Sequence, residues 1–189
     1  KEAAYSHFKP MKEELFISKK YNMGGREITL RGKVDRIDSL TNTEKNNFRI
    51  IDYKTGNIST NLYTELYYGK KVQLFIYSNA LREMLGKSPL GVYYFNAKPG
   101  YDSKEKKILE GITLDGGAIK DIDSRLNDKN FTKSDIIKAE RKGDDFIYSS
   151  IEEEDLKKLE KYAVEISERA LQQMAEGNIK SCPTEKSCQ

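Results

Sequence analysis

Alternating apolar and polar residues are the clearest pattern in the first third of the chain. Within residues 27–38, Ile28 and Leu30 alternate with polar neighbours, which predicts a strand with one buried face. Apolar runs at 13–18 and 48–54 predict two further strands. Because polar or turn-forming segments separate the three, we expect them to form an antiparallel meander.

Two longer segments carry apolar residues at spacings of three and four, as helices do. Residues 64–85 show the pattern most clearly and stop at Gly86, a residue type that commonly closes a helix. Residues 151–177 show it again. The continuously apolar run 91–96 predicts a central strand, and a helical crossover would make it parallel to strand 48–54.

The rest of the second half is charged and gives weaker signals. Residues 111–140 contain a helix-like stretch at 118–126 and are typical of an insertion or lid. Residues 145–149 predict one more short strand.

Composition limits the class of protein. The chain has 189 residues, of which 33% are charged and 37% hydrophobic, so we expect one polar domain spanning 1–189. No apolar run approaches the ~20 residues of a membrane span, and no secretory leader is visible, so we expect a cytoplasmic protein without membrane contact. With 33 basic and 30 acidic residues, a nucleic-acid site would have to be a local patch.

Candidate chemistry lies at the end of strand 48–54. Asp52 and Lys54 are two residues apart and so point to the same face of a strand. Taken alone, such a pair is more often an exposed ion pair of little consequence. Asp35 leaves the polar face of the preceding strand, and whether it meets Asp52 depends on strand register, which a sequence does not show.

Three motifs in order raise the significance of these residues. They are Gly32-Lys33-Val34-Asp35-Arg36-Ile37-Asp38, then Ile51-Asp52-Tyr53-Lys54-Thr55-Gly56, then Gln73 followed four residues later by Tyr77. This series resembles the RecB-like branch of the PD-(D/E)XK nuclease superfamily, and within it the C-terminal nuclease domain of the AddB component of AddAB-type helicase–nucleases. Three ordered motifs across roughly fifty residues form a strong signal.

The resemblance implies a fold and a site. The fold would be α/β, a restriction-endonuclease-like core with a central mixed β-sheet flanked by helices. Asp35 and Asp52, with the carbonyl of Tyr53, would ligate Mg²⁺ or Mn²⁺, and Lys54 would hold the attacking water. Gln73 and Tyr77 would contact the substrate, although on spacing alone a core tyrosine hydrogen-bonded to a nearby glutamine fits equally well.

Two features of the family are incomplete here. The family's metal-binding histidine lies on an early helix, whereas His7 stands in a loop before a strand, so we expect that helix upstream of Lys1 and a weakly active or inactive isolated fragment. Cys188 could open the family's cysteine run, which holds a [4Fe–4S] cluster in the full-length parent. Such a cluster needs four thiolates. Because the chain has only Cys182 and Cys188, we expect no intact cluster in it.

The leading hypothesis is a metal-dependent DNA exonuclease domain of a helicase–nuclease that processes double-strand breaks. Its partners would be DNA, most simply a single-stranded end, and a helicase domain or helicase subunit. The alternatives are a CRISPR-associated RecB-like exonuclease and a catalytically silent nucleic-acid-binding or scaffolding module. Tyrosines and lysines interleave at 67–71, which suits either a single-stranded groove or an ordinary solvated helix start.

Overall fold

The protein is built around one mixed β-sheet. The computed structural model describes residues 2–23, 25–41, 47–56, 61–97, 108–115, 118–178 and 180. The strands follow the order β1 (Phe8–Met23), β2 (Arg26–Leu40), β3 (Phe48–Lys54), β4 (Pro89–Asn96), β5 (Leu109–Leu114) and β8 (Ser150–Ile151). Neighbouring strands β1, β2 and β3 are antiparallel, β3 and β4 are parallel, β4 and β5 are antiparallel, and β5 and β8 are parallel.

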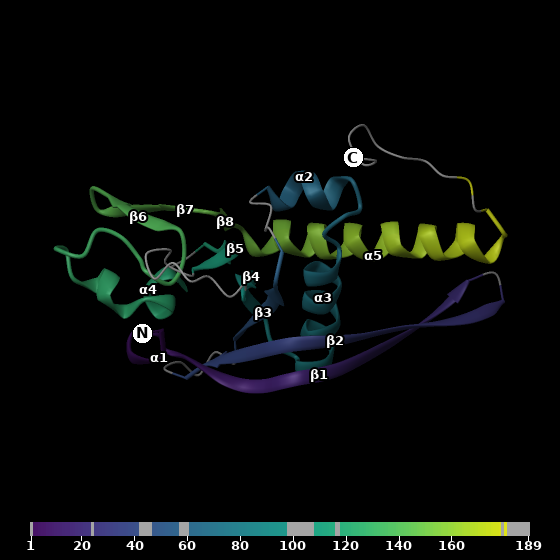
Figure 1. The fold of residues 1–189 in the computed structure, drawn as a ribbon, viewed down its shortest axis with the longest axis horizontal. Coiled ribbons are helices and arrows are strands. Elements are labelled where there is room, and N and C mark those ends of the chain that lie inside the picture. Colours follow the sequence, from purple (N-terminus) through teal and green to yellow (C-terminus); the bar gives the residue numbers. More distant parts are fainter. Residues whose placement is uncertain are drawn as a thin grey trace.

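This arrangement confirms the predicted α/β class, the meander of the first three strands and the parallel partner of β3. The remaining elements are α1 (Glu2–Tyr5), α2 (Leu62–Tyr67), α3 (Gln73–Leu85), α4 (Ala118–Ile122), the 3₁₀ turn η1 (Ser124–Asn127), a separate hairpin of β6 (Ala139–Lys142) and β7 (Asp145–Tyr148), and α5 (Glu153–Ala175). Figure 1 shows the long β1–β2 hairpin running lengthwise along the molecule, with α3 between it and α5.

Side chains of the sheet pack into two hydrophobic clusters. Ile50 belongs to a cluster that includes residues of α2, α3 and α5, whereas its neighbour Ile51 belongs to one that includes residues of α4 and η1. Adjacent strand residues point to opposite faces. The centre of the sheet is therefore covered on both sides, which explains why β3 and β4 read as nearly continuous apolar runs.

The single helix predicted for residues 64–85 is wrong. The structure places two helices there, α2 and α3, separated by a turn. Gly69 sits in this turn with a φ of 71°, a left-handed conformation that glycine adopts at little cost and that ends a right-handed helix. The apolar period continued across the break because both helices bury residues in the same cluster, as Leu66 and Leu74 do.

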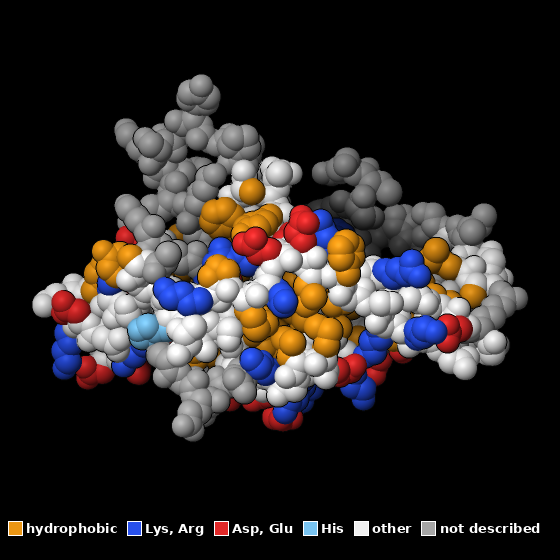
Figure 2. Space-filling view, turned by 90° about the horizontal axis from the view of Figure 1, so that it is seen from below, with side chains coloured by type: hydrophobic (Ala, Val, Ile, Leu, Met, Phe, Trp, Pro, Cys, Tyr) orange, Lys and Arg blue, Asp and Glu red, His pale blue; other side chains and the backbone are white. Residues whose placement is uncertain are grey.

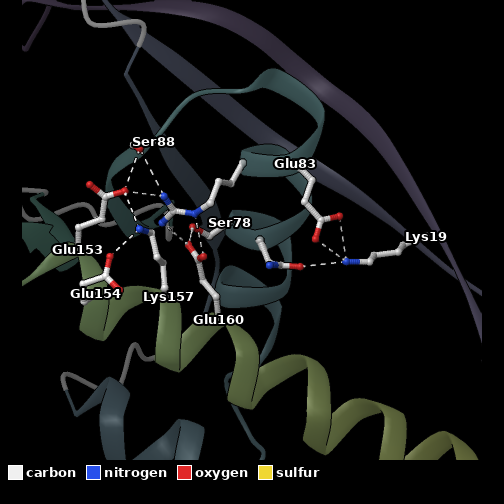
Figure 3. Close-up of polar contacts among 10 residues, drawn as sticks. Lys19, Ser78, Glu83, Ser88, Glu153, Glu154, Lys157 and Glu160 are labelled. Carbon is white, nitrogen blue, oxygen red and sulfur yellow. Dashed lines mark hydrogen bonds and ion pairs between the residues drawn. The ribbon is translucent and has the colours of Figure 1, made fainter.

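Buried polar contacts join α3 to α5 (Figure 3). Glu160 of α5 is almost fully buried and accepts hydrogen bonds from the hydroxyl of Ser78 at 2.5 Å and from Nε of Arg82 at 3.0 Å. Glu153, at the start of α5, accepts from Ser88 and from Arg82. Because a buried charge is costly without partners, this network holds α3 in one orientation against α5.

The surface carries both signs of charge. On the face seen in Figure 2, Lys and Arg side chains are interspersed with Asp and Glu rather than gathered into a single field. Within the described part of the chain, no helix is long and apolar enough to cross a membrane.

Candidate active site

Strand register brings Asp35 and Asp52 together. Pairing of β2 with β3 ends where Arg36 faces Ile51, and one further step along this register sets Asp35 beside Asp52. At this point the Asp35 carboxylate accepts a hydrogen bond of 2.8 Å from the backbone amide of Tyr53. The negative charge of Asp35 also helps to raise the pKa of Asp52. The carboxylates therefore lie close enough to interact electrostatically.

Asp52 is a buried carboxylate with one cationic partner. Asp52 is only 3% exposed to solvent. Nζ of Lys54 lies 2.5 Å from Oδ2 of Asp52, and the two form an ion pair without the alignment of a regular hydrogen bond. Burial raises the pKa of Asp52, while Lys54 and, more weakly, Lys71 act in the opposite direction. Any further positive charge placed beside this carboxylate stabilises its ionised form.

Lys54 is tied to α3 through a chain of hydrogen bonds. Its ammonium donates to Oε1 of Gln73 at 3.1 Å, and Nε2 of Gln73 donates to the hydroxyl of Tyr77 at 2.9 Å. Gln73 opens α3, and Tyr77 follows one turn later with its ring in the core. The spacing of the two residues allows a core tyrosine with a nearby glutamine, and the structure adds that this glutamine reaches Lys54.

The structure adds Tyr94 and Lys71, which sequence reasoning did not assign to the site. Tyr94 lies on β4 in register with Asp52 of β3. Its ring centroid is 5.5 Å from Nζ of Lys54 and 5.2 Å from Nζ of Lys71. The motifs mark only β2, β3 and α3. The crossover predicted that β4 runs parallel to β3, but the register that sets Tyr94 beside Asp52 is not encoded in a local pattern.

The second half of the first motif is structural. Asp38 is fully buried and accepts hydrogen bonds from Nε of Arg36 at 2.7 Å and from Nη2 of Arg49 at 2.7 Å. The Arg49 guanidinium in turn lies over the ring of Phe8 at 4.6 Å. Within one motif, Asp35 thus faces the site, while Asp38 joins β2 to Arg49 of β3 and accepts from Arg36.

His7, which we did not expect to bind a metal, lies away from the candidate site. His7 is separated from Asp35 by a stretch of the β1–β2 ladder, since Phe8 pairs with Leu40, and its Nδ1 lies 3.1 Å from a carboxylate oxygen of Asp121. Cys182 and Cys188 fall outside the described residues, so the iron–sulfur prediction stays a prediction.

The oxygen atoms at the site suit a hard cation. Successive strand residues direct their carbonyls to opposite sides. Because the carbonyl of Lys54 accepts from Ala97, after β4, that of Tyr53 points towards β2 and Asp35. Two carboxylates and a carbonyl match Mg²⁺ or Mn²⁺, and Mg²⁺ commonly keeps several waters. Among the described residues, no group of three or more His, Cys, Asp and Glu side chains could hold a metal ion.

Comparison with known proteins places this geometry in a family. The family model described as PD-(D/E)XK nuclease superfamily matches residues 1–189. The chain belongs to the PD-(D/E)XK nuclease superfamily. Asp52 and Lys54 have the acidic-x-Lys spacing that the family's name contains, and the sheet register sets Asp35 beside Asp52.

Curated relatives are similar to this superfamily member over most of its length. Two of them are the B subunits of ATP-dependent helicase/deoxyribonucleases: that of Clostridium tetani is 33% identical over 186 residues, and that of Clostridioides difficile is 31% identical over 182 residues. These alignments cover 86% and 84% of the chain but only 16% of each relative. The chain thus spans about one sixth of the length of these relatives.

Proposed function

We propose that this chain is a metal-dependent DNA exonuclease domain, acting in the cytoplasm as the nuclease part of a helicase–nuclease that processes double-strand breaks. Its substrate would be a single-stranded DNA end delivered by a helicase domain or subunit. The proposal is supported above all by the close approach of Asp35, Asp52 and Lys54 from two strands, with Lys54 also hydrogen-bonded to Gln73 of α3.

The reaction would be hydrolysis of a phosphodiester bond. Water attacks phosphorus, the bond to one ester oxygen breaks, and a proton passes to the leaving oxygen. Mg²⁺ or Mn²⁺ bound by Asp35, Asp52 and the Tyr53 carbonyl would offset charge on the phosphoryl oxygens and lower the pKa of water. Lys54, steadied by Gln73, would donate a hydrogen bond to the attacking water or to a phosphoryl oxygen as negative charge develops.

A catalytically silent DNA-binding module is the second candidate. The small number of metal ligands supports it: among the described residues, the site has two carboxylates and no third metal-binding side chain. The pairing of Asp52 with Lys54 favours the nuclease, since a silent copy has no need of a buried carboxylate beside a lysine. The names of the curated relatives favour a helicase–nuclease over a CRISPR-associated exonuclease.

The test is degradation of labelled single-stranded DNA by the complete protein with Mn²⁺ or Mg²⁺. We expect activity that chelation abolishes and that Asp52→Ala reduces by at least about a hundredfold. Asp144→Ala removes the same charge from an exposed turn and should degrade DNA like the wild type. Equal rates for Asp52→Ala and wild type would refute the catalytic assignment, whereas DNA binding without degradation by the wild type would support the silent module.

A further inference from the structure

Lys71 is an uncommitted cation beside the candidate active site. Its ammonium lies over the ring of Tyr94, 5.2 Å from the ring centroid. Within the described ranges it forms no ion pair with a carboxylate, whereas Lys54 is paired with Asp52 at 2.5 Å. Its side chain is half-buried, so its charge is less screened than that of a fully exposed lysine.

The ring of Tyr94 lies near the ammonium groups of both Lys54 and Lys71. The Tyr94 side chain is nearly fully buried on β4, in register with Asp52. The electron-rich face of a neutral tyrosine attracts ammonium groups. Lys54 and Lys71 are thereby held near one ring, although only the charge of Lys54 is balanced by Asp52. Because Lys71 is in no ion pair with a carboxylate of the described residues, its ammonium is available to an anion at this place.

Neighbouring groups add to the same preference. α3 begins at Gln73, two residues after Lys71, and no side chain caps its N-terminus, where the helix dipole is positive. Before the turn at Gly69, Tyr67 and Tyr68 are 70% and 51% exposed, and their ring centroids lie 5.3 Å apart. Unpaired bases stack on exposed aromatic rings, and these two tyrosines precede Lys71 by four and three residues.

We propose that Lys71, held against Tyr94, binds a phosphodiester group of a single DNA strand next to the bond that is cleaved. This subsite rests on the proposed function and gives it a residue that fixes the strand without taking part in the chemistry. Lys71 would act on binding, while Lys54 would act on the reaction.

The test measures binding of a labelled single-stranded deoxyoligonucleotide to the complete protein in EDTA, across a range of salt concentrations. We expect Lys71→Ala to weaken binding about tenfold at low salt. The slope of log affinity against log salt should become shallower by about 0.7, the loss of one phosphate contact to a single strand. Lys71→Arg should bind like the wild type. Lys20→Ala removes the same charge where Lys20 pairs with Glu27 near the hairpin tip, and should leave both quantities unchanged.

Kinetics and a duplex control complete the test. With metal present, Lys71→Ala should raise KM about tenfold and leave kcat within about twofold. Unchanged affinity and salt slope, a loss confined to kcat, or an equal loss for blunt duplex DNA would each overturn the proposal. A wild type that cleaves no DNA, combined with weakened binding by Lys71→Ala, would refute the nuclease and leave the subsite standing. Circular dichroism and thermal unfolding verify that each variant is folded.

Discussion

The ring of Tyr77 lies against the backbone of Gly32, so closely that a Cβ atom at Gly32 would come within 2.6 Å of Cε1 and 2.9 Å of the hydroxyl oxygen. The first and third motifs are therefore one packed unit: the glycine of β2 makes room for the tyrosine of α3. That tyrosine hydroxyl in turn accepts from Gln73, which meets Lys54. Adding a methyl group at Gly32 would displace Tyr77, which is linked to Lys54 at the site through its hydrogen bond with Gln73 and the bond from Lys54 to Gln73.

Gly32→Ala should accordingly destabilise the fold and slow the reaction. Overpacking a tight contact costs about 1–3 kcal/mol, and moving Tyr77 releases Gln73. We expect a lower midpoint in urea unfolding and a lower kcat. In a Tyr77→Leu background the same substitution should cost clearly less, because its clash partner is gone. Additive effects in this double-mutant cycle would show that the contact is unimportant.

Gln73→Leu should lower kcat more than it lowers DNA affinity. The change keeps the approximate size of the side chain but removes the acceptor that steadies the Lys54 ammonium. Misplacing a group near the reaction centre can cost about a hundredfold in rate, and we expect a loss of roughly tenfold to a hundredfold. Tyr77→Phe, which removes only the outer hydrogen bond, should cost less. A larger effect of Tyr77→Phe than of Gln73→Leu on single-turnover rates would contradict this order.

Asp52→Asn should stabilise the protein in chelator and abolish its stabilisation by metal. Burial raises the pKa of Asp52 above 3.8, so the folded state becomes less stable as pH rises from 3.8 through the raised pKa, and the full cost applies above that pKa. Removing that charge should raise Tm in EDTA by about 2–4 °C. Excess Mg²⁺ should raise Tm of the wild type but not of the variant. Equal Tm shifts with Mg²⁺ in both proteins would rule out Asp52 as a ligand.

Asp123 should supply stability that acid removes. Burial alone would raise the pKa of Asp123, but hydrogen bonds from Arg125 and Ser134 outweigh it and hold the pKa below 3.8. The contribution is therefore present above 3.8 and is lost as pH falls through the lowered pKa. Asp123→Asn should cost about 3 kcal/mol at neutral pH, and the difference from wild type should narrow as pH falls below 3.8. Urea unfolding measures both, with Asp144→Asn as the exposed control; a gap independent of pH would contradict the assignment.

Local sequence patterns were enough to predict much of the secondary structure of this protein. Alternation placed β2, a short apolar run placed β3, and the two-residue spacing of Asp52 and Lys54 put both on one face of a strand, because strand geometry has a period of two. Periodicity failed at residues 64–85, where two helices bury the same core and only the left-handed turn at Gly69 separates them. Short charged strands such as β6 carried too little alternation to be recognised.

The sequence by itself determined which groups could perform chemistry: two carboxylates, a lysine and a glutamine, in an order that a nuclease family shares. Tertiary structure alone decided that Asp35 stands beside Asp52, that Tyr94 joins them, and that Arg36 and Asp38 do not. The reason is physical. Side-chain direction along one strand follows from its own geometry, whereas register between strands depends on the whole core, and a slip of one residue would turn each side chain to the opposite face.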